Sequence, residues 1–418
     1  MAINNVGTQK PARLNTDFWK YWTGQTISNL GSSITLFALP LLVFKLTGSA
    51  LNLGITTAAE FVPYLLFGLL IGAWLDRADR KRTMIVTDIA RAVIIATIPV
   101  LAFFGILTIW WLYLVAFVHS TLKIAFDAGQ FAALPSLVDN DDLVTANGRI
   151  EASFAAAQIA GPPLAGLLIT LLPIAWLMSF DALSFLVSAY SLFLIHKSFN
   201  ASGGEKKPVS SIGRDVIEGL RYVLRHPVLR NISLMMAIIN LLATPLQSQL
   251  VLFAKDRLRA SDFQVSLLFA VGSLGIVVLS LAAGPLRKRW SFGVVALGAL
   301  MADGLLTVAL AFTSWFWLAL VLWGVAMGVG ILFNINTGSL RQSIVPNEML
   351  GRVASIARVL AWSAIPIGSL LGGIAVDRTG NVSLIYAVLG GLIFLTALAF
   401  SFSPLGHAER YLQKPEQA

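Results

Sequence analysis

The chain has 418 residues, of which 57% are hydrophobic and only 12% are charged, and its formal net charge is +9. A soluble domain keeps about a quarter of its residues charged because its surface must face water, so most of this chain's surface is expected to face lipid. The absence of cysteine excludes disulfides and thiolate chemistry, and the four histidines lack metal-ligand spacing, so neither a metal nor a cofactor is expected.

Twelve segments are long and apolar enough to be transmembrane helices. A helix needs about 20 apolar residues to cross the hydrocarbon core of a bilayer. In chain order the predicted spans are 18–44, 53–75, 84–105, 109–128, 147–171, 174–196, 229–253, 263–284, 291–312, 314–337, 351–376 and 382–402. The sequence therefore predicts an all-α membrane protein. Residues 1–17 are polar and lack a signal-peptide pattern, so the first helix is expected to act as the insertion signal.

Polar side chains form stripes along two of the predicted helices. The stripe on the first helix consists of Gln25, Ser28, Asn29 and Ser32. The stripe on the seventh helix, at the i, i+4, i+7 spacing of one helical face, consists of Asn240, Thr244 and Gln247. Such stripes line a polar cavity or join helices by hydrogen bonds. Pro40 and Pro245 are expected to bend the outer parts of these two helices.

Acidic residues inside the predicted spans are candidates for proton binding. Ionisable side chains are costly within a bilayer and are therefore functional candidates. Glu60 in the second span and Asp303 in the ninth are the most deeply placed acids. An apolar environment favours the protonated carboxyl group, so each could bind and release a proton, or each could be paired and silent in transport. Asp181 in the sixth span could serve as a proton site or as part of a gate.

Other charged residues are expected to form a gate at the cytoplasmic ends of the helices. Asp88 and Arg91 lie three residues apart on one helix face and can pair with each other. Two further acids lie close in sequence to Lys123 and Arg149. The predicted gate consists of Asp76, Arg80, Asp88, Arg91, Asp127 and Glu151.

The longest polar stretch, residues 197–228, lies between the sixth and seventh spans. Apolar residues recur at helical spacing among arginines in its second part, which predicts an amphipathic helix lying on the cytoplasmic leaflet. We interpret the stretch as a linker rather than a regulatory segment. The predicted organisation is a six-helix bundle over 1–196, the linker 197–228, and a second six-helix bundle over 229–418.

The chain matches itself at an offset of 207 residues. At this offset Ile124, Phe126, Ser136, Val138, Asn140 and Leu143 fall on Ile331, Phe333, Ser343, Val345, Asn347 and Leu350. Gly161 and Gly166 fall on Gly368 and Gly373. Six spans separate the copies, so both have the same orientation in the membrane. Parallel repeats are typical of carriers that bind substrate between two halves and rock the halves to alternate access.

The distribution of basic residues predicts that both termini are cytoplasmic. Lys and Arg are retained on the cytoplasmic side of membrane proteins. The few that fall in predicted outer segments are Lys45, Lys255, Arg257, Arg259 and Arg378. The basic residues form no separate basic domain or aromatic-interleaved stripe, so nucleic-acid binding is not expected.

The loop after the second predicted span reads Gly72-Ala-Trp-Leu-Asp76-Arg77-Ala-Asp79-Arg80-Lys81-Arg82. It resembles the Gly-x-x-x-Asp-Arg-x-x-Arg-[Lys/Arg] loop of the major facilitator superfamily and lies between the same two helices. The resemblance implies a latch that holds one conformation until it is released, formed by Gly72, Asp76, Arg77, Arg80 and Lys81. The alternative is an ordinary cluster of basic residues in a cytoplasmic loop.

The fifth predicted span contains Gly161-Pro162-Pro163-Leu164-Ala165-Gly166, which is similar to the Gly-Pro-rich motif of antiporters in this superfamily. The eleventh span carries a matching set of small residues that includes Gly368 and Gly373. Small residues are also ordinary packing positions in membrane helices. The resemblance favours export over uptake.

Within the superfamily the chain most resembles twelve-helix bacterial exporters of the macrolide-efflux and enterobactin-exporter type. Members of that group often carry an Asp directly after the glycine of the first helix, but here Gly31 is followed by Ser32. If that Asp binds the coupling proton in relatives, this chain must use another carboxylate. The resemblance also implies a substrate cavity between the first and seventh helices, lined by Gln25, Asn29, Ser32, Phe37, Asn240, Thr244 and Gln247.

Together these features predict a non-enzymatic secondary transporter of a bacterial inner membrane, monomeric, which exports small amphiphilic molecules by proton antiport. No phosphate-binding loop with Lys-Ser or Lys-Thr occurs, so protons rather than ATP are the expected energy source. One alternative is an uptake symporter or facilitator of the same fold. Another, from a different class, is a membrane sensor or assembly partner that does not transport.

Overall fold

The computed structural model of the protein describes residues 14–75, 78–199 and 212–411. The helices of the first part are α1 (Thr16–Thr47), α2 (Ala50–Leu75), α3 (Arg80–Phe103), α4 (Ile109–Leu137), α5 (Leu143–Leu168) and α6 (Leu177–Phe193). They are followed by α7 (Ile212–Arg225), α8 (Pro227–Ser248), α9 (Leu250–Asp256), α10 (Asp262–Arg289), α11 (Gly298–Phe312), α12 (Phe316–Ile344), α13 (Asn347–Trp362), α14 (Ala364–Thr379) and α15 (Val382–Ser401). Short helical turns cover Asn140–Asp142, Ile174–Trp176, Gly293–Leu297 and Pro404–Tyr411.

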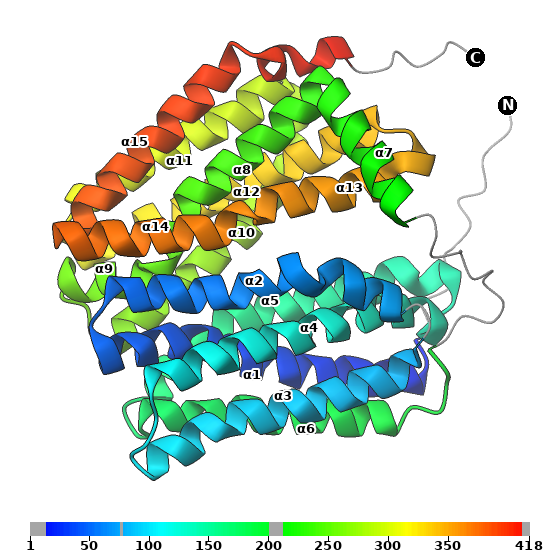
Figure 1. The fold of residues 1–418 in the computed structure, drawn as a ribbon, viewed down its shortest axis with the longest axis vertical. Helices are drawn as coiled ribbons and strands as arrows, with labels where there is room; N and C mark the ends of the chain where they lie inside the picture. The colour runs from blue at the N-terminus through cyan, green and yellow to red at the C-terminus, as the bar shows by residue number, and fades with distance from the viewer. Residues whose placement is uncertain (1–13, 76–77, 200–211, 412–418) are drawn as a thin grey trace, which may run out of the picture.

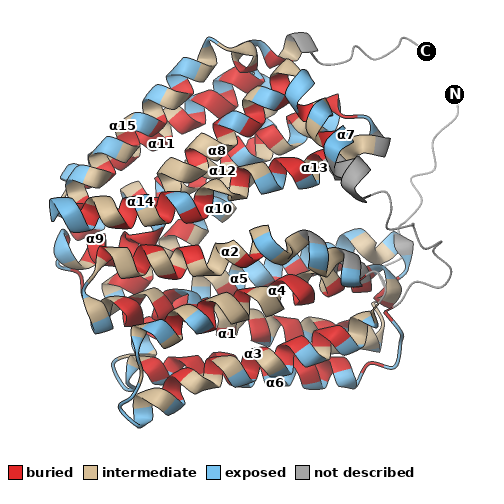
Figure 2. Cartoon of the chain, viewed as in Figure 1, coloured by how far each residue is buried: buried red, intermediate tan, exposed pale blue. Residues whose placement is uncertain are grey.

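The predicted all-α membrane architecture is confirmed. In the described part of the chain, 11 helices are long and apolar enough to cross a membrane. The fifth predicted span is α5, a helix of 26 residues that is not among these 11. Large apolar side chains lie on the outside of the bundle, as for Trp110, which is 76% exposed. Figure 2 shows exposed residues on outward helix faces and buried residues between the helices.

Two predicted spans are each broken into two helices. The seventh consists of α8 and α9, which meet at Gln249, four residues after Pro245. The eleventh consists of α13 and α14, which meet at Ser363. Proline lacks an amide hydrogen, so it weakens the helix in which it lies. The break near Pro245 agrees with the expected bend, whereas α1 stays helical past Pro40 to Thr47.

The helices form two groups with the same internal neighbours. In the first group α1 packs on α5 and α6, α3 packs on α4 and α6, and α2 packs on α4. In the second group α8 packs on α13, α14 and α15, α11 packs on α12 and α15, and α10 packs on α12. Figure 1 shows α1–α6 on one side and α8–α15 on the other. We call these groups the N half and the C half.

Two helix pairs, α2 with α14 and α5 with α10, join the halves. The repeated glycines lie at related contacts. A Cβ on Gly161 would lie 1.8 Å from the Ser33 hydroxyl of α1, and one on Gly368 would lie 2.4 Å from the Leu241 carbonyl oxygen of α8. Gly166 faces α10, and Gly373 faces the start of α2, so these two lie across the junction of the halves. The repeat found in the sequence is therefore a repeat of close helix packing.

Polar contacts between the halves gather at the end of the bundle where α1 meets α2, which we call the closed end. The Lys45 ammonium of α1 and the Lys255 ammonium of α9 each lie 2.5 Å from the Asp262 carboxylate of α10. Gln249 Nε2 donates to the Ala50 carbonyl oxygen at 2.9 Å, although the two residues lie in different halves. The start of α1, the end of α15 and α7 lie at the opposite end, which we call the termini end (Figure 1).

These contacts give structural roles to two of the basic residues that the sequence places in an outer segment. Lys255 bonds Asp262 and the Ala260 carbonyl oxygen. Arg257 donates to the carbonyl oxygens of Phe312 and Thr313, which lie at the end of α11. The basic residues therefore close this end of the bundle.

Replacing Asp262 by Asn should loosen the closed end, because one carboxylate pairs with ammonium groups from both halves. Partly exposed ion pairs contribute about 1 kcal/mol at most, which corresponds to roughly a fivefold change in the population of the opened end. Ala50 is buried between the halves and the chain has no cysteine. The labelling rate of Ala50→Cys by a polar thiol reagent should therefore rise several-fold in Asp262→Asn.

The matched control is Asp17→Asn, which removes an ion pair with Lys20 within α1 alone. It should leave the labelling rate unchanged. Equal labelling rates in Asp262→Asn and in the parent would show that the ion pairs do not hold the halves together.

Candidate functional site

A cavity of about 620 Å³ lies among the helices of the N half. All of α1–α6 contribute to its wall, and Trp362 at the end of α13 contributes from the C half. Its polar and charged lining includes Gln25, Ser28, Asn29, Ser32, Thr35, Glu60, Arg91, His119, Lys123, Asp127, Gln130, Glu151, Gln158 and Asp181. A cavity of this size can hold a small organic molecule.

Close packing of α1 on α6 forms one wall of the cavity. A Cβ on Gly31 would lie 2.2 Å from the Ser184 hydroxyl, and Gly24 faces Ser191 further along α6. This approach brings polar side chains of the two helices together. Gln25 Nε2 donates to the Ser188 hydroxyl at 2.8 Å, and the Ser32 hydroxyl donates to Asp181 Oδ1 at 3.2 Å. The polar stripe of the first helix therefore bonds α6 and lines the cavity at the same time.

Asp181 is a fully buried carboxylate on this wall. Its side chain is 0% exposed, and Oδ1 also accepts from the Ser184 hydroxyl at 3.3 Å. Oδ2 has no hydrogen-bond partner among the described residues, and the Thr35 hydroxyl of α1 is unpaired as well. A buried carboxylate oxygen without a donor is costly when it is charged. This wall therefore holds a polar group that its protein surroundings satisfy only in part.

Arg91 occupies the centre of the charged cluster. Its Nη1 lies 3.4 Å from Asp88 Oδ1, as the sequence predicts, and its Nε lies 3.4 Å from His119 Nε2. The guanidinium carbon lies 3.9 Å from the centre of the Phe185 ring. Ion-pair, hydrogen-bond and cation–π contacts together fix the position of this buried cation.

An aromatic group forms the wall nearest the C half. The Trp362 ring centre lies 5.2 Å from that of Tyr64 and 6.3 Å from that of Phe61, both edge to face. Glu60 lines the cavity beside them. Aromatic rings bind apolar surface and also attract cations to their faces. This wall suits a molecule that is partly apolar.

The structure brings together only some of the predicted cavity residues. Gln25, Asn29 and Ser32 line the cavity, together with the acids Glu60 and Asp181. The other predicted residues lie outside its lining: Phe37, Asn240, Thr244, Gln247 and Asp303.

Their contacts explain these positions. Phe37 is fully buried against Phe269 of α10, with ring centres 5.7 Å apart. Asn240 donates to the Ala361 carbonyl oxygen at 2.9 Å, and Thr244 donates to Asn240. The stripe on the seventh helix thus satisfies backbone groups near the helix breaks, which is the hydrogen-bonding alternative left open by the sequence. Asp303 is buried in α11, away from the cavity.

The predicted gate residues do not form one cluster. Asp76 and Arg77 lie outside the described residues. Arg80 donates to the Phe199 carbonyl oxygen at 3.3 Å, and Lys81 donates to that of Ile195. The space beside Gly72 is open, since a Cβ there would meet no atom within 4 Å among the described residues.

Two of the acids expected at the gate, Asp127 and Glu151, lie in the cavity wall instead. Asp127 pairs with Lys123 at 2.5 Å, one turn away on α4, and both line the cavity. Glu151 lines it from α5. Arg149 turns away from Glu151 and lies 4.9 Å from the Trp19 ring centre. The termini ends of α4 and α5 therefore contribute charge to the cavity.

Sequence reasoning missed several cavity residues. A polar stripe on the sixth helix, at spacings of three and four residues, could have revealed the wall against α1: Asp181, Ser184, Ser188 and Ser191. His119 and Gln158 are polar residues inside predicted spans and could have been noted on that ground. Trp362 gave no signal, because its place depends on how the halves meet.

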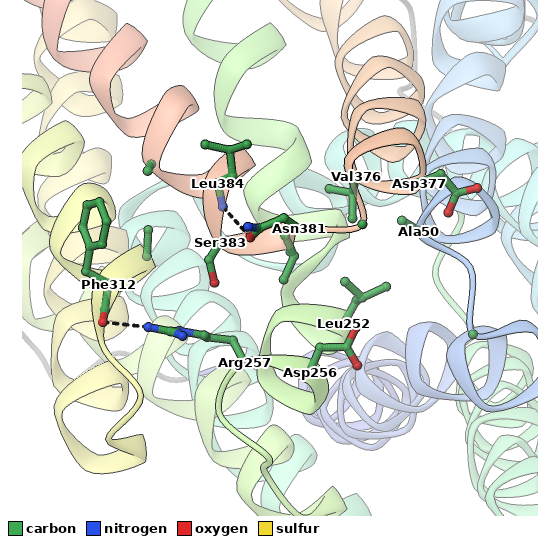
Figure 3. Close-up of a pocket in the computed structure, with 15 residues that line it drawn as sticks. Ala50, Leu252, Asp256, Arg257, Phe312, Val376, Asp377, Asn381, Ser383 and Leu384 are labelled. Carbon is green, nitrogen blue, oxygen red and sulfur yellow. Dashed lines mark hydrogen bonds between the residues drawn. The ribbon is translucent and has the colours of Figure 1, made fainter.

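A second pocket, of about 540 Å³, lies at the closed end between α9, α11 and the α14–α15 connection. Figure 3 shows Arg257 reaching the Phe312 carbonyl oxygen and Asn381 capping the start of α15. Its polar groups are thus engaged in holding helix ends. Among the described residues, no group of three or more His, Asp or Glu side chains could hold a metal ion.

Residues 21–369 match the model of the Major Facilitator Superfamily. The chain belongs to the major facilitator superfamily. It is therefore a membrane transporter that crosses the bilayer several times, and not an enzyme. The resemblance inferred from the Gly72–Arg82 loop and the repeat is confirmed.

Efflux proteins are among the relatives of this major facilitator protein. It is 26% identical to macrolide efflux protein A of Streptococcus pyogenes over 387 residues, which cover 91% of this chain and 94% of that one. It is 28% identical to the multidrug efflux pump Tap of Mycolicibacterium fortuitum over 372 residues, covering 84% and 87%. The crystal structure of the nucleoside transporter NupG has the same fold, with a TM-score of 0.72, 15% identity, and coverage of 92% of this chain and 98% of that one.

Replacing Arg91 by Ala should destabilise the transporter strongly, because Asp88 would be left buried without its cation. Breaking a buried ion pair costs about 3–5 kcal/mol, so we expect the midpoint of thermal unfolding in detergent to fall by roughly 5–10 °C. Arg149→Ala, which removes only a contact with the Trp19 ring, should lower it far less. The double variant Asp88→Asn, Arg91→Gln should recover much of the loss, and no recovery would contradict this account.

Proposed function

We propose that the protein exports small amphiphilic molecules by proton antiport across a bacterial inner membrane, acting as a monomer. The observation that carries the proposal is the cavity, which combines buried charge, an aromatic wall and a closed end. The names of the two efflux relatives support export and support drugs as the class of substrate. The Gly-Pro-rich segment of α5 supports antiport.

In this proposal the termini end faces the cytoplasm. Basic residues at that end support the assignment, because cytoplasmic segments retain Lys and Arg: Arg80, Lys81, Arg82, Arg221, Arg225, Arg287, Lys288 and Arg289. The closed end then faces outward, and the structure represents an inward-facing state. The cavity lining extends toward the cytoplasm through Gln130 and Glu151.

The chemistry of the lining favours amphiphilic molecules with a positive charge. Four acids line the cavity, against the two basic side chains of Arg91 and Lys123. Lys123 is paired with Asp127, and Arg91 with Asp88, so the remaining acids can attract a cation. Phe61, Tyr64 and Trp362 supply apolar surface for the rest of the molecule.

Alternating access would follow from rocking of the two halves. Opening toward the outside requires loss of the closed-end contacts, which are few and partly exposed. Closing toward the cytoplasm would use the loop from Gly72 to Arg82, whose glycine has room for a partner. The breaks at Gln249 and Ser363 lie in the helices that line the junction of the halves, where small rotations can be absorbed.

The test is accumulation of a radiolabelled macrolide in everted membrane vesicles energised by a proton gradient. Accumulation should exceed that of vesicles without the protein and should collapse on addition of a protonophore. Accumulation that survives the protonophore would exclude proton coupling. Uptake of the compound by whole cells expressing the protein, rather than its extrusion, would favour an importer.

Replacing Trp362 by Ala should raise the macrolide concentration for half-maximal transport roughly two- to tenfold, because about 0.5–1.5 kcal/mol of aromatic contact is lost. The matched control is Trp317→Ala, since Trp317 is 54% exposed on the outside of α12. Equal effects of the two changes would show that the cavity does not bind the substrate.

A further inference from the structure

We propose that Asp181 is the group that takes up and releases the coupling proton, and that Ser32 positions it. This proposal rests on the proposed function as a proton antiporter and identifies the site at which the coupling occurs. The structure places the Asp181 carboxylate beside the Ser32 hydroxyl, at 3.2 Å, although the two lie 149 residues apart in sequence.

The first argument is the hydrogen bonding of the carboxylate. Ser32 and Ser184 both donate to Oδ1 and hold the group against α1. Oδ2 is buried and receives no hydrogen bond from the described residues. When Oδ2 carries a proton it becomes a donor, and the unpaired Thr35 hydroxyl of the same wall can accept from it. The carboxylate is thus buried with both of its hydroxyl donors on one oxygen, and protonation removes a charge that is costly in this setting.

The second argument is the count of buried charge. The three ionisable groups that meet at this wall, Asp88, Arg91 and Asp181, are at most 4% exposed. Asp88 already pairs with the one cation of the three. The group therefore has a net charge of −1 when both carboxylates are ionised. Binding of one proton removes this net buried charge, which is costly in an apolar interior.

The other charged and titratable side chains near Asp181 do not change this net charge of −1. His119 on α4 faces Arg91 Nε with its Nε2 atom, so that nitrogen acts as an acceptor and the ring is neutral. Lys123 is paired with Asp127. From α2, Glu60 and Tyr64 line the same cavity at its aromatic wall. The helices α1 and α6 contribute hydroxyl and amide groups around Asp181.

The other two candidate acids fit the role less well. Asp303 is buried in α11 and lies outside the cavity lining, so substrate cannot compete with its proton directly. Glu60 lies among Phe61, Tyr64 and Trp362, where an amphiphilic cation would bind. Asp181 lines the cavity and also lies at the contact between α1 and α6. Its protonation can therefore respond both to bound substrate and to the packing of these two helices.

The contact of Asp181 with α1 connects proton binding to the closed end of the bundle. Gly24 and Gly31 allow α1 to approach α6, and Ser32 bonds Asp181 at this contact. The same helix carries Lys45, which pairs with Asp262 of the C half. A proton entering from water at the outer side forms an O–H bond at Oδ2 and weakens the Ser32 bond by removing its charge. Release of the proton to cavity water restores the charge-assisted bond.

The first experiment uses Asp181→Asn, which keeps an oxygen for the Ser32 hydroxyl and nearly the same volume but cannot titrate. In everted vesicles, accumulation of a radiolabelled macrolide driven by the proton gradient should fall at least tenfold. Exchange of labelled for unlabelled macrolide without a gradient should remain well above that of vesicles without the protein, which also shows that the variant folds. The purified wild-type protein in weakly buffered detergent solution should release protons when the macrolide is added, and the variant should not.

Two further variants complete the design. The control Asp303→Asn removes an equally buried carboxyl group outside the cavity and should retain both accumulation and proton release. The exchange of side chains, Ser32→Asp with Asp181→Ser, places the carboxylate at the same contact from the other helix. This double variant should regain proton-driven accumulation that the single variant Asp181→Ser has lost.

The outcomes separate this inference from the proposed function. If wild-type accumulation does not depend on the proton gradient, the proposed antiport is wrong. If wild-type accumulation depends on the gradient and Asp181→Asn retains it, or if only Glu60→Gln removes it, the assignment of Asp181 is wrong. Loss of exchange as well as accumulation in both Asp181→Asn and the exchanged double variant would overturn the assignment and give Asp181 a structural role.

Discussion

Close approach of helix backbones at glycine positions is the constraint on which the rest of this structure depends. Lipid tails are as apolar as the helices, so helix association within a membrane relies on packing and hydrogen bonds rather than on the hydrophobic effect. Gly31 lets α1 lie against α6, and Gly304 and Gly390 let α11 lie against α15. Only at such distances can a serine of one helix bond a carboxylate of the next. The cavity chemistry is thus a product of the packing.

The two halves keep this packing in common but differ in charge. At the offset of 207 residues the glycines of α5 fall on those of α14. The buried charged cluster does not repeat, because Asp88, Arg91 and Asp181 fall on Val295, Gly298 and Val388. The C half has therefore kept the helix contacts without this charged cluster, and its buried acid Asp303 lies outside the cavity lining. In this chain the buried ion pair and most of the cavity lining belong to the N half, and the C half contributes Trp362 to the wall.

Much of the architecture was predictable because it follows from local properties of the chain. Apolar length predicted the helices, and the offset of 207 residues predicted their repeated arrangement. The helical period also predicted that Asp88 and Arg91 pair, since partners three residues apart share one face. It could not tell which helix a polar face meets. The Asn240 stripe was therefore assigned to the cavity, although it bonds the backbone of α13.

The sequence could not predict which residues of one half would contact the other half, and Trp362 is the clearest case. This side chain lines the cavity from α13, and the next residue, Ser363, is the break before α14. Helix α14 is in turn one of the helices that join the halves. The aromatic wall of the cavity therefore lies directly beside the joint between two helix segments. A single peptide bond, between Trp362 and Ser363, separates the cavity wall from that joint.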